Sequence, residues 1–357
     1  MYGKIAICFL LATATALFGQ TTVSYVYVGE NTSPQKITAL AIRSDNTVHT
    51  VSGSPFTAPG QWLAASTNFL YATDHTNIAA FKRNSSGSLT LLSSFNGVRN
   101  GDAEVGTLTL DRTAASLYAS EDDGLGDNDY DIYNKLSSGK LSYFSSTGFD
   151  VLYGAALIFN TTNKFAYIPT CIQATFSVAG FIRESDGILT PFNPNADLPP
   201  EGATEDLCPT NMASSAQGYA AIAFGAANLT GTQSIAIYRI AADGTMKFVS
   251  EISTSFANAA NEPVSLQFDS TGVHLAAAGH NGIQLYNLSS AGVLTKVGSP
   301  LYTGTIFRDL KWDHTGHVYT ISHSAVYFFV VKNGKLVQAA SPRTVAGASS
   351  LITVSLQ

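Results

Sequence analysis

A unit of about 48 residues recurs seven times along the chain, and this repeat constrains the fold more than any other feature. Each copy has a short apolar segment that often ends in Tyr-Ala, a polar loop, a second apolar segment, a turn with glycine and a third segment. Clear copies read FLYATDHTNIAAFKRNSSGSLTLLSSF, FAYIPTCIQATFSVAGFIRESDGILTPF and HLAAAGHNGIQLYNLSSAGVLTKVGSPL. The repeat therefore predicts seven equivalent structural units.

One more apolar segment precedes several of these units, as in TLTLD, LIFN, SLQFD and LKWD. Each unit then has four strands, and the turns SSG, SDG, ADG, SAG and KNG join the third strand to the fourth as a hairpin. Helical periodicity of the apolar residues is absent. Four-stranded units repeated seven times are typical of one architecture. We predict an all-β fold, a single seven-bladed β-propeller with four-stranded antiparallel blades.

The two ends of the propeller are predicted to meet in one blade. SSLITVSLQ at the C-terminus is a lone strand with no unit after it, and the N-terminal unit begins at its second strand. We therefore expect Leu351–Leu356 to supply the inner strand of the first blade. This pairing would close the ring and leave no free sheet edge at the junction.

Residues 1–20 have the pattern of a secretory signal peptide. A lysine near the start precedes the apolar run Ile5–Leu11, and small residues follow. We expect cleavage near Gly19 or Gln20, which leaves a secreted or periplasmic propeller over residues 21–357. The apolar run is too short to span a bilayer, and no later segment is long and uncharged enough, so no membrane span is expected.

The charge balance excludes nucleic-acid binding as a primary role. Only 12% of the residues are charged, and 19 Lys+Arg against 25 Asp+Glu give a net charge of −6. A protein that neutralises phosphates needs a basic stripe, which this sequence lacks.

The aromatic and aliphatic content of the sequence is high enough to bury a sizeable core. We expect the protein to be a monomer.

YVYVGENTS near the mature N-terminus, the endings SGSPF and GSPL, and the DxxGxxLYA-type units resemble the lactonase-like seven-bladed propellers. That family includes bacterial 6-phosphogluconolactonases, carboxymuconate cyclases and YVTN-repeat proteins. The resemblance covers the whole mature chain. It implies inner strands that begin with Pro-Arg-His or Pro-His, with His, Arg and Glu side chains around the channel that act on a lactone. The corresponding stretches here carry only Arg308 and Glu262 where such a catalytic charge is expected.

Two functions remain open from this comparison. The missing Pro-His elements favour an exported binding or interaction platform with a degenerate lactonase site. Such a platform would take a small polar ligand, a glycan or a protein at the channel face and would require no cofactor. The alternative is a hydrolase for an unphosphorylated sugar lactone, in which Arg308 polarises the carbonyl and an acidic residue or histidine is the base.

Polar residues at the ends of the second strands are candidates for a ligand site, because the loops after these strands surround one mouth of the channel. The equivalent positions in five blades are His75, Asp122, Cys171, His280 and His323. Three histidines at one repeat position, with Asp74 nearby, indicate a site for a polar ligand or a metal. The alternative is that a polar residue at a strand end caps the loop.

An acidic segment of the third unit suggests calcium. Asp127, Asp129 and Asp131 alternate as at the start of a calcium-binding loop, where carboxylates converge on a hard cation. The glycine and the distal glutamate that complete such a loop are missing. A solvated acidic loop is therefore the alternative.

The cysteines predict a disulfide. Cys8 falls in the signal peptide, which leaves Cys171 and Cys208 in the mature chain. An even pair in an exported protein is typical of a disulfide. We place Cys171 at the end of a second strand and Cys208 in the loop before the next blade, on the same face. In the chain-entropy model, such a bridge stabilises the fold by ~4 kcal/mol.

Two histidines and one tryptophan could bind a metal or a ligand, but we give them structural roles. His314 and His317 flank a predicted turn on the opposite face, with no Cys or carboxylate partner in view. Trp312 lies on a predicted inner strand. We interpret the histidines as turn residues and the tryptophan as part of the core.

Overall fold

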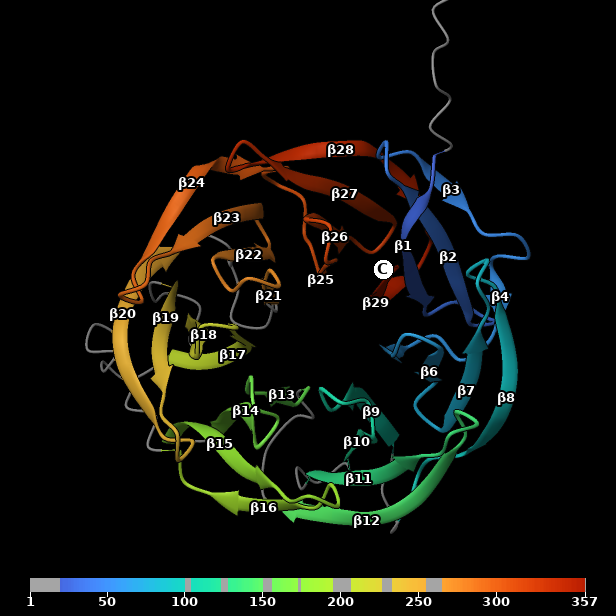
Figure 1. Cartoon of the computed structure of the whole chain (residues 1–357), viewed down its shortest axis with the longest axis horizontal. Coiled ribbons are helices and arrows are strands. Elements are labelled where there is room, and N and C mark those ends of the chain that lie inside the picture. Colours follow the sequence, from blue (N-terminus) through green and yellow to red (C-terminus); the bar gives the residue numbers. More distant parts are fainter. Residues whose placement is uncertain are drawn as a thin grey trace, which may run out of the picture.

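The computed structural model describes residues 20–99, 104–122, 128–149, 156–172, 175–194, 207–226, 233–254 and 265–356. These residues form seven antiparallel sheets arranged as a ring around a central axis (Figure 1). The predicted seven-bladed propeller is confirmed. The predicted signal peptide falls on residues outside the described part, apart from its last residue, and stays a prediction.

The first four blades contain the following strands. Blade 1 has β29 (Ala348–Ser355), β1 (Thr22–Glu30), β2 (Lys36–Arg43), β3 (Val48–Thr50) and β4 (Phe56–Thr57); blade 2 has β5 (Trp62–Ala65), β6 (Phe69–Thr73), β7 (Asn77–Arg83) and β8 (Leu89–Asn96); blade 3 has β9 (Glu104–Leu110), β10 (Ser116–Asp122), β11 (Asn128–Lys135) and β12 (Leu141–Phe149); blade 4 has β13 (Ile158–Phe159), β14 (Phe165–Ile172), β15 (Thr175–Arg183) and β16 (Leu189–Phe192).

The remaining three blades repeat the same order from the axis outward. Blade 5 has β17 (Leu207–Ser214), β18 (Tyr219–Ala226), β19 (Gln233–Ile240) and β20 (Met246–Thr254); blade 6 has β21 (Ser265–Phe268), β22 (His274–Gly279), β23 (Gly282–Leu288) and β24 (Leu294–Leu301); blade 7 has β25 (Asp309–Trp312), β26 (His317–Ile321), β27 (Ala325–Lys332) and β28 (Lys335–Thr344).

The C-terminal strand closes the ring. β29 pairs antiparallel with β1, with Tyr27 opposite Ile352 and Val28 opposite Leu351. Blade 1 therefore takes its inner strand from the C-terminus and its other strands from the N-terminus, as the lone C-terminal strand predicts. A side-chain hydrogen bond from Ser349 Oγ of β29 to the Gly29 carbonyl of β1 (3.0 Å) adds to the backbone pairing of the two ends.

The hydrophobic core is divided among the interfaces between neighbouring blades. Successive side chains on a strand point to opposite faces of its sheet, so each blade contributes to two interfaces. Tyr71 and Ala80 of blade 2 pack with Leu108 and Leu117 of blade 3, whereas Ala72 packs in the cluster shared with blade 1. This alternation is why the strands are apolar on both faces.

Hydrogen bonds from tyrosines of the second strands also join neighbouring blades. Each of these hydroxyls donates to the carbonyl of a glycine in the outer turn of the next blade: Tyr27 to Gly87 (2.8 Å), Tyr71 to Gly139 (3.1 Å), Tyr118 to Gly187 (2.7 Å) and Tyr167 to Gly244 (2.8 Å). Burial raises the pKa of Tyr118 to about 12. The Tyr-Ala endings and the glycine turns of the repeat are thus two halves of one contact.

The described residues contain no helix with the length and hydropathy needed to cross a membrane.

Candidate functional site

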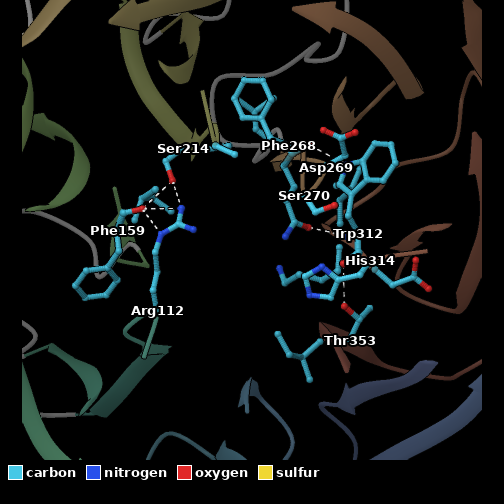
Figure 2. Close-up of a pocket in the computed structure, with 18 of the residues that line it drawn as sticks. Arg112, Phe159, Ser214, Phe268, Asp269, Ser270, Trp312, His314 and Thr353 are labelled. Carbon is cyan, nitrogen blue, oxygen red and sulfur yellow. Dashed lines mark hydrogen bonds between the residues drawn. The ribbon is translucent and has the colours of Figure 1, made fainter. Parts of the chain in front are cut away.

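A cavity of about 490 Å³ lies at the end of the central axis where the inner strands terminate (Figure 2). Its walls come from β9, β13, β17, β21, β25 and β29 and from the turns that follow these inner strands. Closure of the ring brings these strands together, so residues that are far apart in the sequence share one cavity. A cavity of this size is in the range that binds small molecules.

Arg112 is fixed on one wall of this cavity. Its Nε and Nη2 donate to the carbonyl of Phe159 at 3.3 and 3.2 Å, and Nη2 also donates to Ser214 Oγ at 2.8 Å. These bonds tie the turn after β9 to the inner strands of blades 4 and 5. Burial of the guanidinium lowers the pKa of Arg112, although an arginine remains charged in proteins. Among the described residues, no carboxylate pairs with it.

The opposite wall carries Trp312 and His314 (Figure 2). Trp312 is held by Gln267, whose carbonyl accepts the indole N–H at 2.9 Å and whose Oε1 accepts the backbone N–H at 2.7 Å. The backbone N–H of His314 donates to Ser355 Oγ at 2.9 Å, and the residue is exposed. Figure 2 shows its imidazole across the cavity from Arg112.

The carboxylates that line the cavity are already engaged. Asp269 lies 2.9 Å from His274 Nδ1, and Asp313 accepts a hydrogen bond of 2.6 Å from Tyr319 and lies 3.3 Å from His317 Nδ1. Burial opposes ionisation of both, but the bonds from these partners outweigh it. The pKa of Asp269 is lowered, and that of Asp313 is held well below its usual range. Both carboxylates cap the turns that begin at these aspartates.

Lys311, a second cation of the cavity, is neutralised by an acid of its own strand. Its Nζ lies 2.6 Å from Asp309 Oδ1, while Asp309 Oδ2 accepts the backbone N–H of Leu351 at 2.9 Å. The pair joins the inner strands of blades 7 and 1. Arg112 is therefore the cationic group of this cavity that lacks a described counter-charge.

The repeat itself contains a signal for this cavity that our sequence reasoning missed. A D-x-T motif follows the inner strand in blades 3, 6 and 7, where the aspartate accepts backbone N–H groups and so caps the turn. The middle residues of the motif all line the cavity: Arg112, Ser270 and His314. Alignment of these turns, rather than of the loops on the other face, finds the site.

The interpretation of Trp312 as a core residue is confirmed, since it is 7% exposed.

Arg308, which we predicted as a catalytic residue, lies at the other mouth of the channel. Arg308 immediately precedes β25, whereas His314 follows it, so the length of the inner strand separates the two. Arg308 is exposed, and Glu262 lies outside the described residues. Their catalytic roles stay predictions, and Arg308 is not part of the cavity.

The blade 2 loop shows the capping role that we gave as the alternative to ligand binding. Asp74 Oδ1 accepts the backbone N–H groups of Thr76 and Asn77 at 3.1 and 2.7 Å, which fixes the turn. The carbonyl of His75 accepts a hydrogen bond from Val105 at the start of β9, and its Nδ1 lies 3.1 Å from Glu104 Oε2. Asp74 thus fixes the blade 2 loop, and His75 joins it to blade 3.

The other two histidines of this mouth lie in the loops between the second and third strands of blades 6 and 7. His323 is exposed between β26 and β27, and its carbonyl accepts a bond from Ala348 at the start of β29. His280 lies in the turn between β22 and β23. Within the described part of the chain, no group of three or more His, Cys, Asp or Glu residues is placed to hold a metal. A polar ligand on His75, His280 and His323 stays a prediction.

Part of the acidic segment of blade 3 is a strand rather than the solvated loop that we gave as the alternative to calcium binding. Asp129 and Asp131 belong to β11, and the side chain of Asp122, the last residue of β10, is not among those described. Asp131 is fully buried and lies 3.4 Å from Arg99 Nε. Asp127 falls outside the described residues, and calcium binding stays a prediction.

The two cysteines lie on neighbouring blades. Cys171 is in β14 as predicted, but Cys208 is in β17, the inner strand of blade 5, rather than in the loop before it. No disulfide is present among the described side chains, which do not include those of Cys171 and Cys208. The disulfide stays a prediction.

Comparison with known proteins supports the architecture alone. No family model and no curated protein matches the sequence. A solved structure from Bacteroides fragilis, provisionally described as a 6-phosphogluconolactonase, has 16% sequence identity and a TM-score of 0.70 over 95% of this chain and 99% of that one. The fold is that of the lactonase-like propellers.

Two further solved structures agree with this fold. The periplasmic gluconolactonase PpgL of Pseudomonas aeruginosa is 13% identical, with a TM-score of 0.69 over 94% of this chain and 100% of its own. A protein from Lactobacillus plantarum is 15% identical, with a TM-score of 0.71 over 94% of this chain and 100% of that one. The lactonase-like architecture therefore extends over nearly the whole described chain.

Proposed function

We propose that this lactonase-like propeller is an exported binding platform that takes a small polar ligand in the cavity at the D-x-T turns, and that its lactonase site is degenerate. The observation that carries the proposal is the state of the carboxylates in that cavity. Asp269 and Asp313 are bound to their own turns and to neighbouring side chains. Neither is available as a general base for a bound lactone, because each would have to release its structural partners.

The cavity is nevertheless suited to binding. Arg112 and Trp312 are held in place by hydrogen bonds, so a ligand does not have to order them. Exposed Ser270 and His314 add polar groups between these two walls. A mostly preformed cavity with a few fixed polar groups is typical of small-molecule sites.

A lactone hydrolase is the second candidate, and one observation favours it. Arg112 and His314 face each other across the cavity, so a carbonyl could be polarised by the cation while the imidazole activates water. Several structural neighbours are described as lactonases. This version of the hydrolase places the chemistry at the D-x-T turns rather than at Arg308.

Proton release in a pH-stat tests the proposal. The purified protein is given a panel of unphosphorylated sugar lactones, and we expect no hydrolysis above the spontaneous rate. Binding of sugars and sugar acids is measured in parallel by calorimetry, and we expect saturable binding.

Enzymatic turnover would contradict the platform. Loss of that turnover in His314→Ala, with Arg308→Ala still active, would place a hydrolase at the D-x-T turns. The reverse result would place it at the opposite mouth. A protein that neither hydrolyses lactones nor binds any member of the panel would also overturn the proposal.

A further inference from the structure

We propose that the cavity at the D-x-T turns selects a small hydroxylated carboxylate over its neutral counterpart, with the carboxylate seated on Nη1 of Arg112. This inference rests on the proposed function, since it names the class of ligand for the same cavity. It is carried by the hydrogen bonds of Arg112, by the lack of a counter-charge for Arg112 among the described residues and by the polar groups on the facing wall.

The orientation of Arg112 leaves one end of the guanidinium for a ligand. Nε and Nη2 are used by the carbonyl of Phe159 and by Ser214 Oγ, and Ser214 itself donates to the same carbonyl at 2.7 Å. No described residue accepts a bond from Nη1. Figure 2 shows the guanidinium at the edge of the cavity and turned toward its interior. The side chain is thus ordered by neutral acceptors while its charge remains available.

Arg112 is the cation of the cavity that is open to an anionic ligand. Asp269 contacts His274, Asp313 contacts His317, and Lys311 is paired with Asp309, so these side chains are already engaged. Arg112 has no such partner among the described residues. Because Arg112 is exposed and lines the cavity, a bound carboxylate can reach its guanidinium and pair with it. Charge-assisted bonds between guanidinium and carboxylate are among the strong hydrogen bonds of proteins.

The facing groups favour hydroxyl groups on the rest of the ligand. The side-chain oxygen of Gln267 accepts the backbone N–H of Trp312. No described residue accepts a hydrogen bond from the side-chain nitrogen of Gln267. Ser270 is exposed at the cavity and makes no hydrogen bond with a described residue through its hydroxyl. A ligand with a carboxylate at one end and hydroxyl groups along its length can use both walls at once.

Matched ligand pairs test the inference on the wild-type protein. D-glucuronate is compared with D-glucose, and D-gluconate with D-glucitol, by calorimetry at constant pH and ionic strength. We expect each acid to bind about tenfold or more tightly than its neutral partner, because a hydrogen bond to a charged group is worth at least a factor of that size. The preference should decline as the salt concentration rises.

The variant Arg112→Gln tests the assignment of the anion to this side chain. We expect it to bind the acids and the neutral sugars equally, that is, to lose the tenfold preference. The matched control is Arg239→Gln, which removes an exposed arginine that stacks on Tyr219 and lies outside the cavity lining. The control should keep the full preference. Circular dichroism and thermal unfolding show whether Arg112→Gln is folded. Arg112→Lys, which retains the charge, is measured in the same way.

The outcomes distinguish this inference from the function on which it rests. Equal binding of acids and neutral sugars by the wild-type protein would overturn the inference and leave the platform intact. An unchanged preference in folded Arg112→Gln would do the same. Absence of binding by every ligand of both pairs would overturn the inference together with the proposed function.

Discussion

At the scale of single residues, the tyrosine and glycine that repeat through the sequence join neighbouring blades. Tyr71 reaches the Gly139 carbonyl of the next blade, and Gly139 has a φ of 84°, which favours glycine. A Cβ at Gly139 would also collide with the ring of Phe69. The turn is therefore restricted to glycine both by its backbone conformation and by the aromatic ring against which it packs.

Tyr71→Phe should lower the free energy of unfolding by about 1 kcal/mol, because the buried Gly139 carbonyl loses its donor while the ring remains. Gly139→Ala should cost more, since it adds strain at a positive φ and a clash with Phe69. Unfolding in urea measures both. Tyr143→Phe is the control, because Tyr143 is 38% exposed. Equal urea midpoints for Tyr71→Phe and the wild type would contradict the role of this bond.

At the scale of elements, the junction of blades 7 and 1 differs from the others. Tyr319, on the second strand of blade 7, donates to the buried carboxylate of Asp313 rather than to a glycine carbonyl. Ser24 of β1 donates to the same carboxylate at 2.9 Å, and His317 Nε2 lies 2.7 Å from Asn46 Oδ1 of blade 1. The blade that joins the two chain ends thus has an ionised group at its border.

Asp313→Asn should destabilise the protein at neutral pH by about 3 kcal/mol, because it removes the charge around which this group of donors is arranged. The pKa of Asp313 is lower in the folded chain than its ordinary value, so its stabilisation is complete above about pH 4 and is lost as the pH falls further. The difference between wild type and variant should therefore shrink in acid.

Urea unfolding at pH 7 and at pH 3 measures this dependence. Asp186→Asn, at an exposed turn where the carboxylate accepts one backbone N–H, serves as the matched control and should change stability little at either pH. A destabilisation by Asp313→Asn that is the same at both pH values would show that the charge of Asp313 is not what stabilises the junction.

The sequence predicts the elements well and the site poorly, for a physical reason. Strand order and ring closure follow from repeated local patterns, so the role of the C-terminal strand as the inner strand of blade 1 is visible in the sequence alone. Arg112 and His314 lie about two hundred residues apart in turns with ordinary composition. They face each other only because closure of the ring brings the ends of the inner strands together. At the other mouth, the carbonyls of His75 and His323 accept hydrogen bonds from the next blade, a backbone role that the residue type does not predict.

At the scale of the whole molecule, the propeller presents two different mouths. The mouth at the D-x-T turns has the cavity, with Arg112 fixed on its wall. The opposite mouth carries the exposed Arg308 and His323, and the His75–Glu104 pair lies between two of its blades. A ring of seven similar blades thus supports different chemistry at its two ends, because the two sets of connecting loops vary independently.

A matched pair of substitutions, one at each mouth, tests most directly whether ligand binding belongs to the D-x-T cavity. Ser270→Trp places an indole in that cavity, and Ser324→Trp places one in an exposed loop at the opposite mouth. D-glucuronate binding is measured by calorimetry for both variants and the wild type. We predict that Ser270→Trp weakens binding by about tenfold or more while Ser324→Trp leaves it unchanged. Loss of binding in Ser324→Trp, with Ser270→Trp unaffected, would contradict the assignment and move the site to the other end of the channel.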